Sequence, residues 1–190
     1  MARMIPENVL SFQTEGEGTT YNFLQGVAKP DDQFIVWYSP DLNNREPDFV
    51  IYNKRCGIVI LEVKDWALDQ IIEANAHTFS VKFGGKVESR TNPLKQATGY
   101  MEQSHLAITE IAYLEQLMDV IHKDGRLVSR DPAYYGKPTI PLSCGVVFTN
   151  INKHEYTEKG LPQVLTTDKA LFWDDLHPES DFCRDHSGKY

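Results

Sequence analysis

An unbroken apolar run, Gly57-Ile-Val-Ile-Leu61, constrains the fold of this chain more than any other feature. Its β-branched side chains favour a strand, and a strand without polar alternation is typical of the middle of a sheet that is covered on both faces. A second run of this kind extends from Asp48 to Tyr52, and the short connection from Asn53 to Cys56 separates the two. This spacing predicts an antiparallel hairpin at the centre of a sheet.

Helices and strands are expected on both sides of this hairpin. Thr14 is placed to cap a helix that ends near Gly26 or before Pro30, because Thr is a preferred N-cap residue. The other patterned segments are a strand at Phe34–Tyr38, a hairpin of Gln70–Glu73 with His77–Phe83, a helix from Asn92-Pro93 that continues as one or two helices to Gly125, a strand at Cys144–Thr149, and a last strand and short helix within Leu161–Leu176. Together these segments predict an α/β fold with a mixed central β-sheet flanked by helices.

The length of 190 residues and the hydrophobic content of 41% suit one compact domain. We expect this domain to span residues 1–178, with residues 179–190 as a polar tail or the start of a linker. No run approaches the ~18 apolar residues of a membrane helix, and the first residues lack the apolar stretch of a signal peptide. A soluble, cytoplasmic protein with no membrane partner is expected.

The cysteines lie far apart without the close Cys or His spacing of zinc or iron–sulfur sites, and we interpret them as reduced thiols.

Two acidic residues occupy matching ends of the predicted hairpin. Asp48 starts the first strand and Glu62 stands near the end of the second, so antiparallel pairing brings the two positions together. Carboxylate oxygens are preferred ligands of Mg²⁺, and the main-chain carbonyl of Val63 offers a further oxygen. Strand alternation places Lys64 on the same face as Glu62, where its ammonium can act on a water and stabilise a developing negative charge. The pattern predicts a metal-dependent site suited to phosphodiester hydrolysis.

An exposed pair at the edge of a sheet is the simpler interpretation of Glu62 and Lys64, because Glu-x-Lys is a common tripeptide. However, Ile58 and Ile60 lie on the same face of the strand as Glu62, so the carboxylate continues a buried stripe. A buried, unpaired carboxylate is costly without a metal or another partner. We therefore favour the metal site over the exposed pair.

The same segments resemble a known family. Glu46-Pro-Asp-Phe-Val-Ile51 and Gly57 to Trp66, with Gly16-Glu17 upstream and Asn92-Pro-Leu-Lys-Gln96 downstream, are similar to the nuclease-related domain (NERD) family. That family is assigned to the PD-(D/E)xK superfamily, which has a restriction-endonuclease-like core. The resemblance implies a nuclease that hydrolyses DNA with Mg²⁺ or Mn²⁺, with Asp48, Glu62 and Lys64 as catalytic residues. It also implies a role in DNA repair or processing, and a helicase domain in the same or another chain as a partner.

Glu17 has two interpretations. Thr14 and Glu17 have the spacing of a capping box, in which the Glu side chain caps the start of the helix. On the family resemblance, Glu17 instead joins Asp48 and Glu62 as a third catalytic and metal-binding carboxylate. The sequence leaves both interpretations open.

Gln96 and Tyr100 lie four residues apart on the predicted helix and so face one way. They resemble the Gln-x-x-x-Tyr motif of related exonucleases, which implies that they contact a phosphate or a strand terminus, with Lys95 nearby to add positive charge. The alternative is an ordinary helix with a buried Tyr and a surface Gln.

The charge distribution leaves a second function open. The net charge is −8, although the segment from Arg45 to Tyr100 holds eight Lys/Arg and seven Asp/Glu and so carries +1. Because nucleic-acid binders usually present a basic footprint, this segment is the expected substrate face. The acidic sum favours the alternative of a catalytically silent nucleic-acid- or partner-binding module that retains the fold.

Overall fold

The predicted hairpin occupies the middle of a six-stranded sheet. The structure, a computed structural model, describes residues 2–29, 33–42, 44–53, 57–107 and 142–177. The strands in spatial order are β1 (Arg3–Ile5), β2 (Phe34–Tyr38), β3 (Phe49–Asn53), β4 (Gly57–Ala67), β8 (Leu142–Asn150) and β9 (Ala170–Leu171). β3 is antiparallel to β2 and β4, whereas β1 with β2, β4 with β8 and β8 with β9 are parallel. The α/β fold with a mixed central sheet is confirmed.

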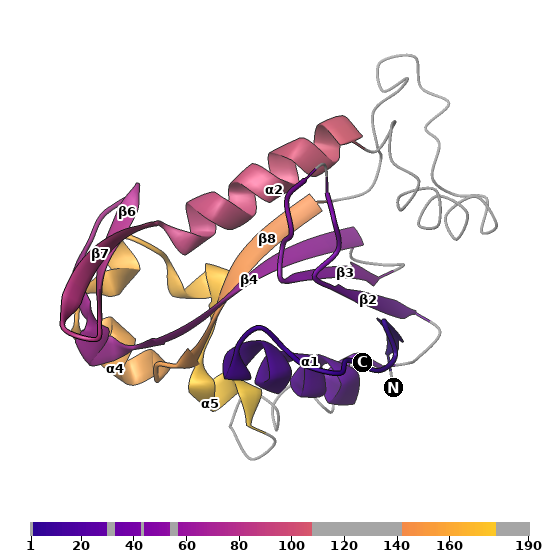
Figure 1. The fold of residues 1–190 in the computed structure, drawn as a ribbon, viewed down its shortest axis with the longest axis horizontal. Coiled ribbons are helices and arrows are strands. Elements are labelled where there is room, and N and C mark those ends of the chain that lie inside the picture. The colour runs from indigo at the N-terminus through magenta and orange to yellow at the C-terminus, as the bar shows by residue number, and fades with distance from the viewer. Residues whose placement is uncertain (1, 30–32, 43, 54–56, 108–141, 178–190) are drawn as a thin grey trace.

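Two helices cover opposite faces of this sheet (Figure 1). On one face lies α1 (Glu15–Val27), whose Leu24 shares a core cluster with Leu61 of β4. On the other lies α2 (Pro93–Ala107), whose Ala97 shares a cluster with Ile60 of β4. Neighbouring residues of β4 therefore enter different layers of the core, as strand geometry requires. Full burial of an aliphatic side chain contributes roughly 1.5–3 kcal/mol, so β4 is held from both sides.

Both helices begin where their capping residues predict. Thr14 Oγ1 accepts a hydrogen bond of 3.2 Å from the backbone N–H of Glu17. Asn92 Oδ1 likewise accepts one of 2.9 Å from the backbone N–H of Leu94. Each bond satisfies one of the N–H groups that a helix start leaves without an internal partner. The expected continuation of the second helix to Gly125, and the polar tail from residue 179, lie outside the described residues.

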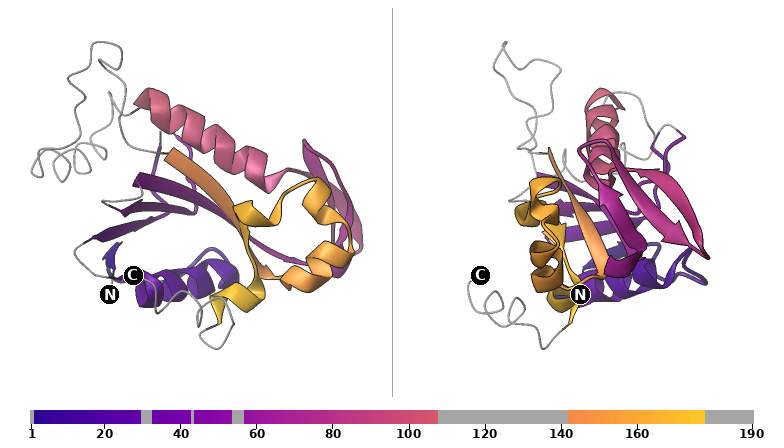
Figure 2. Two further views of the ribbon diagram at one scale, coloured as in Figure 1. Left: turned by 180° about the vertical axis from the view of Figure 1, so that it is seen from behind. Right: turned by 90° about the vertical axis from the view of Figure 1, so that its left-hand side faces the viewer.

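A second, three-stranded sheet follows β4 in the chain and precedes α2 (Figure 2). A short 3₁₀ turn (Leu68–Gln70) leads into β5 (Ile71–Ala74), β6 (Thr78–Phe83) and β7 (Lys86–Thr91). The predicted hairpin corresponds to β5 and β6, but β7 was not predicted. Its sequence Lys-Val-Glu-Ser-Arg-Thr carries almost no apolar signal, because most of its side chains are exposed. Phe79 and Val81 of β6 face inward and are fully buried.

The C-terminal part of the described chain packs against β8. It comprises α4 (Lys153–Glu158), two 3₁₀ turns (Leu161–Gln163 and Thr167–Lys169), β9 and α5 (Trp173–Leu176). The predicted last strand and short helix are confirmed, whereas α4 was not predicted. Phe148, Tyr156 and Phe172 are fully buried here, and the Tyr156 and Phe172 rings lie 4.9 Å apart. Among the described helices, none is long and apolar enough to cross a membrane.

Candidate functional site

Asp48 and Glu62 face each other across the β3–β4 hairpin. The last paired residues of that ladder are Phe49 and Leu61, so Asp48 and Glu62 are the next positions in register. The backbone N–H of Val63 donates a hydrogen bond of 2.6 Å to Asp48 Oδ2. Cross-strand partners present their side chains on one face, here the face covered by α2. Glu62 is only 2% exposed and lies in the central strand β4. The interpretation of Glu62 and Lys64 as an exposed pair at the edge of the sheet is therefore wrong.

Burial and like charge act together on these two carboxyl groups. Burial raises the pKa of Asp48 to about 7, and the charge of Glu62 adds to this, whereas the N–H of Val63 and the charge of Lys64 oppose it. Burial also raises the pKa of Glu62, although the contact with Lys64 opposes it. Two partly desolvated acids side by side cannot both ionise at low cost. The pair is therefore electrostatically strained when no metal ion is bound, although Lys64 relieves part of the strain.

Lys64 lies on the same face of β4 as Glu62 and forms an ion pair with its Oε1. The other carboxylate oxygen, Oε2, is buried and has no hydrogen-bond partner in the described part of the protein. The Lys64 side chain is 17% exposed, and its ammonium lies 5.7 Å from the centre of the Trp66 ring. Its charge is thus held against the acidic pair at the boundary with solvent.

Glu17 combines bonds to the residues just before α1 with closeness to the acidic pair. Its carboxylate accepts hydrogen bonds from the Gln13 N–H at 3.2 Å, from Thr14 Oγ1 at 3.3 Å and from the Tyr38 hydroxyl at 2.5 Å. The charge of Glu17 also raises the pKa of both Asp48 and Glu62, after the larger effect of burial. The Thr14 side chain caps α1, but the Glu17 carboxylate accepts from the N–H of Gln13 and not from that of Thr14, so the reciprocal half of the capping box is absent from this described segment. The carboxylate contributes to the field of the pair. Among the described residues, no group of three or more His, Cys, Asp or Glu side chains is arranged to hold a metal ion.

Gln96 and Tyr100 of α2 meet each other above the acidic pair. Gln96 Nε2 donates a hydrogen bond of 3.0 Å to the Tyr100 hydroxyl. Burial raises the pKa of Tyr100, and the charges of Glu62 and Asp48 add to this, which places the hydroxyl within their field. The structure does not bring Lys95 to this pair. Its Nζ lies 3.2 Å from His77 Nδ1 instead, on an exposed part of α2.

Comparison with known proteins adds one finding. A family model described as "nuclease-related domain" matches residues 13–121, more than half of the chain and a span that includes every residue of the candidate site. The chain belongs to the NERD family. No curated protein and no solved structure matched the chain. The family is therefore established by the family model, and the assignment to the PD-(D/E)xK superfamily is consistent with the mixed sheet.

Two residues next to the site of this NERD domain were missed by the sequence analysis. Asp65 follows Lys64 and points to the opposite face of β4. There its Oδ2 accepts a hydrogen bond of 2.9 Å from the backbone N–H of Gly16, and its Oδ1 accepts a hydrogen bond of 2.6 Å from Thr149 Oγ1. A Cβ atom at Gly16 would lie 1.6 Å from Asp65 Oδ1, so only glycine fits there. Asp65 thus ties the start of α1, and with it Glu17, to β4 and β8.

Tyr38 was also missed as a partner of the acidic residues. Burial, followed by the hydrogen bond to Glu17, raises the pKa of Tyr38 to about 12, so the phenol remains a donor at ordinary pH. The one sequence signal for this residue was its place at the end of a predicted strand, Phe34–Tyr38. Strand alternation alone does not reveal that its hydroxyl reaches a helix terminus.

Proposed function

We propose that this NERD domain is a metal-dependent nuclease that hydrolyses DNA phosphodiester bonds with Mg²⁺ or Mn²⁺. The observation that carries the proposal is the arrangement of Asp48, Glu62 and Lys64: two facing carboxylates of raised pKa and a lysine on one face of the central hairpin. Such an arrangement is of no use to the core, because packing would be served better by apolar side chains. It suits a site that receives a cation and a phosphate.

The residues present fit a divalent ion. Asp48, Glu62 and the carbonyl of Val63 would hold it, because hard ions such as Mg²⁺ take carboxylate and carbonyl oxygens together with waters. The buried Oε2 of Glu62 has no partner among the described residues and is available as a ligand. Glu17, whose carboxylate is engaged by Tyr38 and the start of α1, would add negative charge nearby. When bound, the ion would neutralise phosphate charge and make a water more acidic.

Lys64 and α2 would serve the substrate. The ammonium of Lys64, held beside Glu62, can orient the attacking water and stabilise the charge that develops on the phosphate oxygens. The Gln96 amide and the Tyr100 hydroxyl can donate hydrogen bonds to a phosphate or a strand terminus that approaches the acidic pair from the α2 side. Lys95 would contribute positive charge near the start of α2, beside His77. On the family resemblance alone, the proposal extends to DNA repair or processing beside a helicase domain in the same or another chain.

A cleavage assay tests the proposal. Single- and double-stranded DNA are incubated with wild-type protein in EDTA, Mg²⁺ or Mn²⁺, and compared with Lys64→Met and with Lys82→Met as a matched control on the exposed face of β6. We expect metal-dependent cleavage by wild type and by Lys82→Met, and its loss in Lys64→Met. Cleavage that persists in Lys64→Met would remove this lysine from the mechanism. No cleavage of any substrate by wild type, with metal and DNA bound, would refute the nuclease.

One observation favours the silent binding module as the competing proposal. The ion pair between Lys64 and Glu62 satisfies part of the site without a metal. Asp48→Ala separates the two proposals, because it removes a metal ligand and also a negative charge that repels phosphates. A nuclease should lose turnover while its DNA affinity, measured by fluorescence anisotropy in EDTA, is kept or increased. A binding module should change modestly in affinity and have no metal-dependent cleavage to lose.

A further inference from the structure

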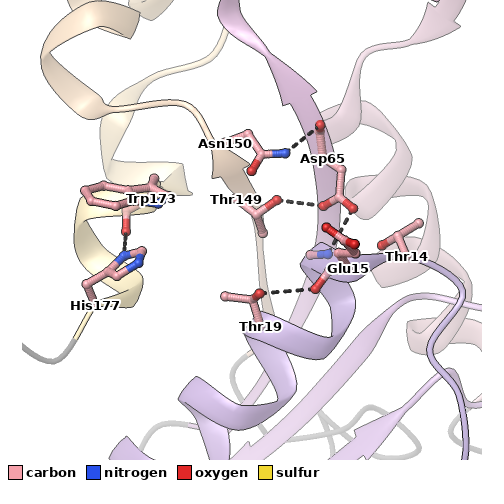
Figure 3. A pocket seen from close by; sticks show the side chains of 9 residues that line it. Thr14, Glu15, Thr19, Asp65, Thr149, Asn150, Trp173 and His177 are labelled. Carbon is pink, nitrogen blue, oxygen red and sulfur yellow. Dashed lines mark hydrogen bonds between the residues drawn. The ribbon is translucent and has the colours of Figure 1, made fainter.

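A pocket of about 430 Å³ is lined by residues of α1, β4, β8 and α5 (Figure 3). Its residue from β4, Asp65, lies on the face of the strand opposite to Glu62 and Lys64. The start of α1 contributes Glu15, and the ends of β4 and β8 contribute Asp65 and Asn150. Trp173 and His177, from α5 and the residue after it, form the facing wall. The pocket therefore has one aromatic and one polar wall, and its size lies within the range of small-ligand sites.

The aromatic wall is exposed and yet firmly held. Trp173 is 46% exposed, although residues at the two ends of this short helix anchor α5: Phe172, just before it, is fully buried, and Leu176, its last residue, is 5% exposed. The His177 ring lies against the indole with 3.9 Å between centroids, and its Nδ1 lies 2.5 Å from the Trp173 carbonyl oxygen, to which it can donate. A large exposed indole on a fixed helix contributes little to the core. It is the kind of surface on which planar rings stack.

The polar wall presents hydrogen-bond acceptors and negative charge. In the described part of the protein, no hydrogen bond engages the Glu15 carboxylate, and Asn150 uses only its Nδ2, which donates to the Asp65 carbonyl oxygen at 2.9 Å. Both carboxylate oxygens of Asp65 are taken by Gly16 and Thr149. The available groups are thus a carboxylate and an amide oxygen. They repel a phosphate and accept from N–H donors, as acidic side chains do from the exocyclic amine of cytosine.

We propose that this pocket binds a nucleobase with an exocyclic amino group (adenine, cytosine or guanine) from single-stranded nucleic acid. The base stacks on Trp173, and its amino group donates to Glu15. The choice of nucleic acid over other planar ligands rests on the proposed nuclease function. The position of the pocket supports this choice, because the pocket and the acidic site share two stretches of chain. Gly16 and Asp65 line the pocket, whereas their chain neighbours Glu17 and Lys64 lie at the acidic site. A strand that crosses this end of the sheet would reach both.

Binding without metal tests the pocket separately from cleavage. Short homopolymers of dA, dC and dT, carrying a fluorescein, are titrated in EDTA with wild type, Trp173→Ala and Glu15→Gln, and anisotropy gives the affinity. Intrinsic fluorescence gives a second readout, since Trp37 and Trp66 are 3% and 7% exposed and Trp173 is the tryptophan that a base can reach. The control variant is Glu158→Gln, an exposed carboxylate on α4 away from the pocket.

We expect dA and dC to quench tryptophan fluorescence and to bind more tightly than dT, which has no amino group. Trp173→Ala should weaken dA and dC about tenfold or more, as loss of one stacking partner does. Glu15→Gln should reduce the preference over dT, whereas Glu158→Gln should not. Equal binding by wild type and Trp173→Ala, or no binding in EDTA, would overturn the pocket even if the protein cleaves DNA. Normal base binding without cleavage would instead refute only the nuclease.

Discussion

Replacement of Asp48 by asparagine is expected to stabilise the metal-free protein. Burial and the charge of Glu62 raise the pKa of Asp48 from 3.8 to about 7. Between these values the folded protein holds a proton that the unfolded chain has released, so wild type loses stability as the pH rises through this window. Above pH 7 the full cost is present. Below pH 3.8 the carboxyl is protonated in both states and the cost vanishes.

The size of this effect follows from the same pKa. One pKa unit corresponds to 1.36 kcal/mol, so the ionised Asp48 destabilises the fold at alkaline pH by up to about 4 kcal/mol. An amide at this position keeps the oxygen that accepts from the Val63 N–H, but its NH₂ group must itself be accommodated beside Glu62. We therefore expect a net gain of about 1–3 kcal/mol. In a protein of this size, 2 kcal/mol raises Tm by roughly 4–8 °C.

Thermal unfolding in EDTA, followed by circular dichroism from acid to alkaline pH, measures this gain. The Tm difference between Asp48→Asn and wild type should be small near pH 4, grow through neutrality and level off above it. The control is Asp69→Asn, which removes an exposed carboxylate in the turn after β4. A variant that is no more stable than wild type at pH 8, or a difference that does not depend on pH, would refute the reasoning that the acidic pair is strained.

Three further outcomes are expected. Gly16→Ala should destabilise the fold by about 1–3 kcal/mol in urea unfolding, because its Cβ would displace Asp65. The control Gly26→Ala, in the same helix, meets no atom within 4 Å and should be neutral or stabilising by up to about 1 kcal/mol. Equal effects of the two substitutions would contradict this. Tyr38→Phe should cost about 1 kcal/mol in the same assay through its lost bond to Glu17, and an unchanged midpoint would argue against that bond. Finally, Mn²⁺ affinity measured by calorimetry should rise with pH up to about 7 and then level off, because Asp48 must lose its proton to bind, and a flat profile would exclude Asp48 as a ligand.

The layered core was predictable because each of its elements carries a local signal. The apolar run of β4, the capping residues Thr14 and Asn92, and the alternation in β6 all agree with the tertiary structure. β7 and α4 gave no such signal. Most β7 side chains are exposed, and α4 buries only Tyr156 within a helix of 6 residues, so neither has an apolar period long enough to detect.

The candidate site divides in the same way. Asp48, Glu62 and Lys64 could be placed on one face from hairpin register and strand alternation, which are local rules. Contacts between distant segments could not be placed. The bonds of Asp65 to Gly16 and Thr149 span 49 and 84 residues, and that of Tyr38 to Glu17 spans 21. The two interpretations of Glu17 have the same origin, because its bonds to Gln13 and Thr14 are local, whereas its effect on Asp48 depends on how α1 packs.

Diffraction from a crystal grown with Mn²⁺, recorded at the manganese absorption edge, tests the central claim most directly. We predict an anomalous peak bound by one carboxylate oxygen of Asp48 and by Oε2 of Glu62, each roughly 2.0–2.3 Å from the ion. Lys64 should remain on the same face of β4. The contradicting result is a fully occupied Mn²⁺ elsewhere on the protein, with Asp48 and Glu62 unliganded or turned to opposite faces of the sheet.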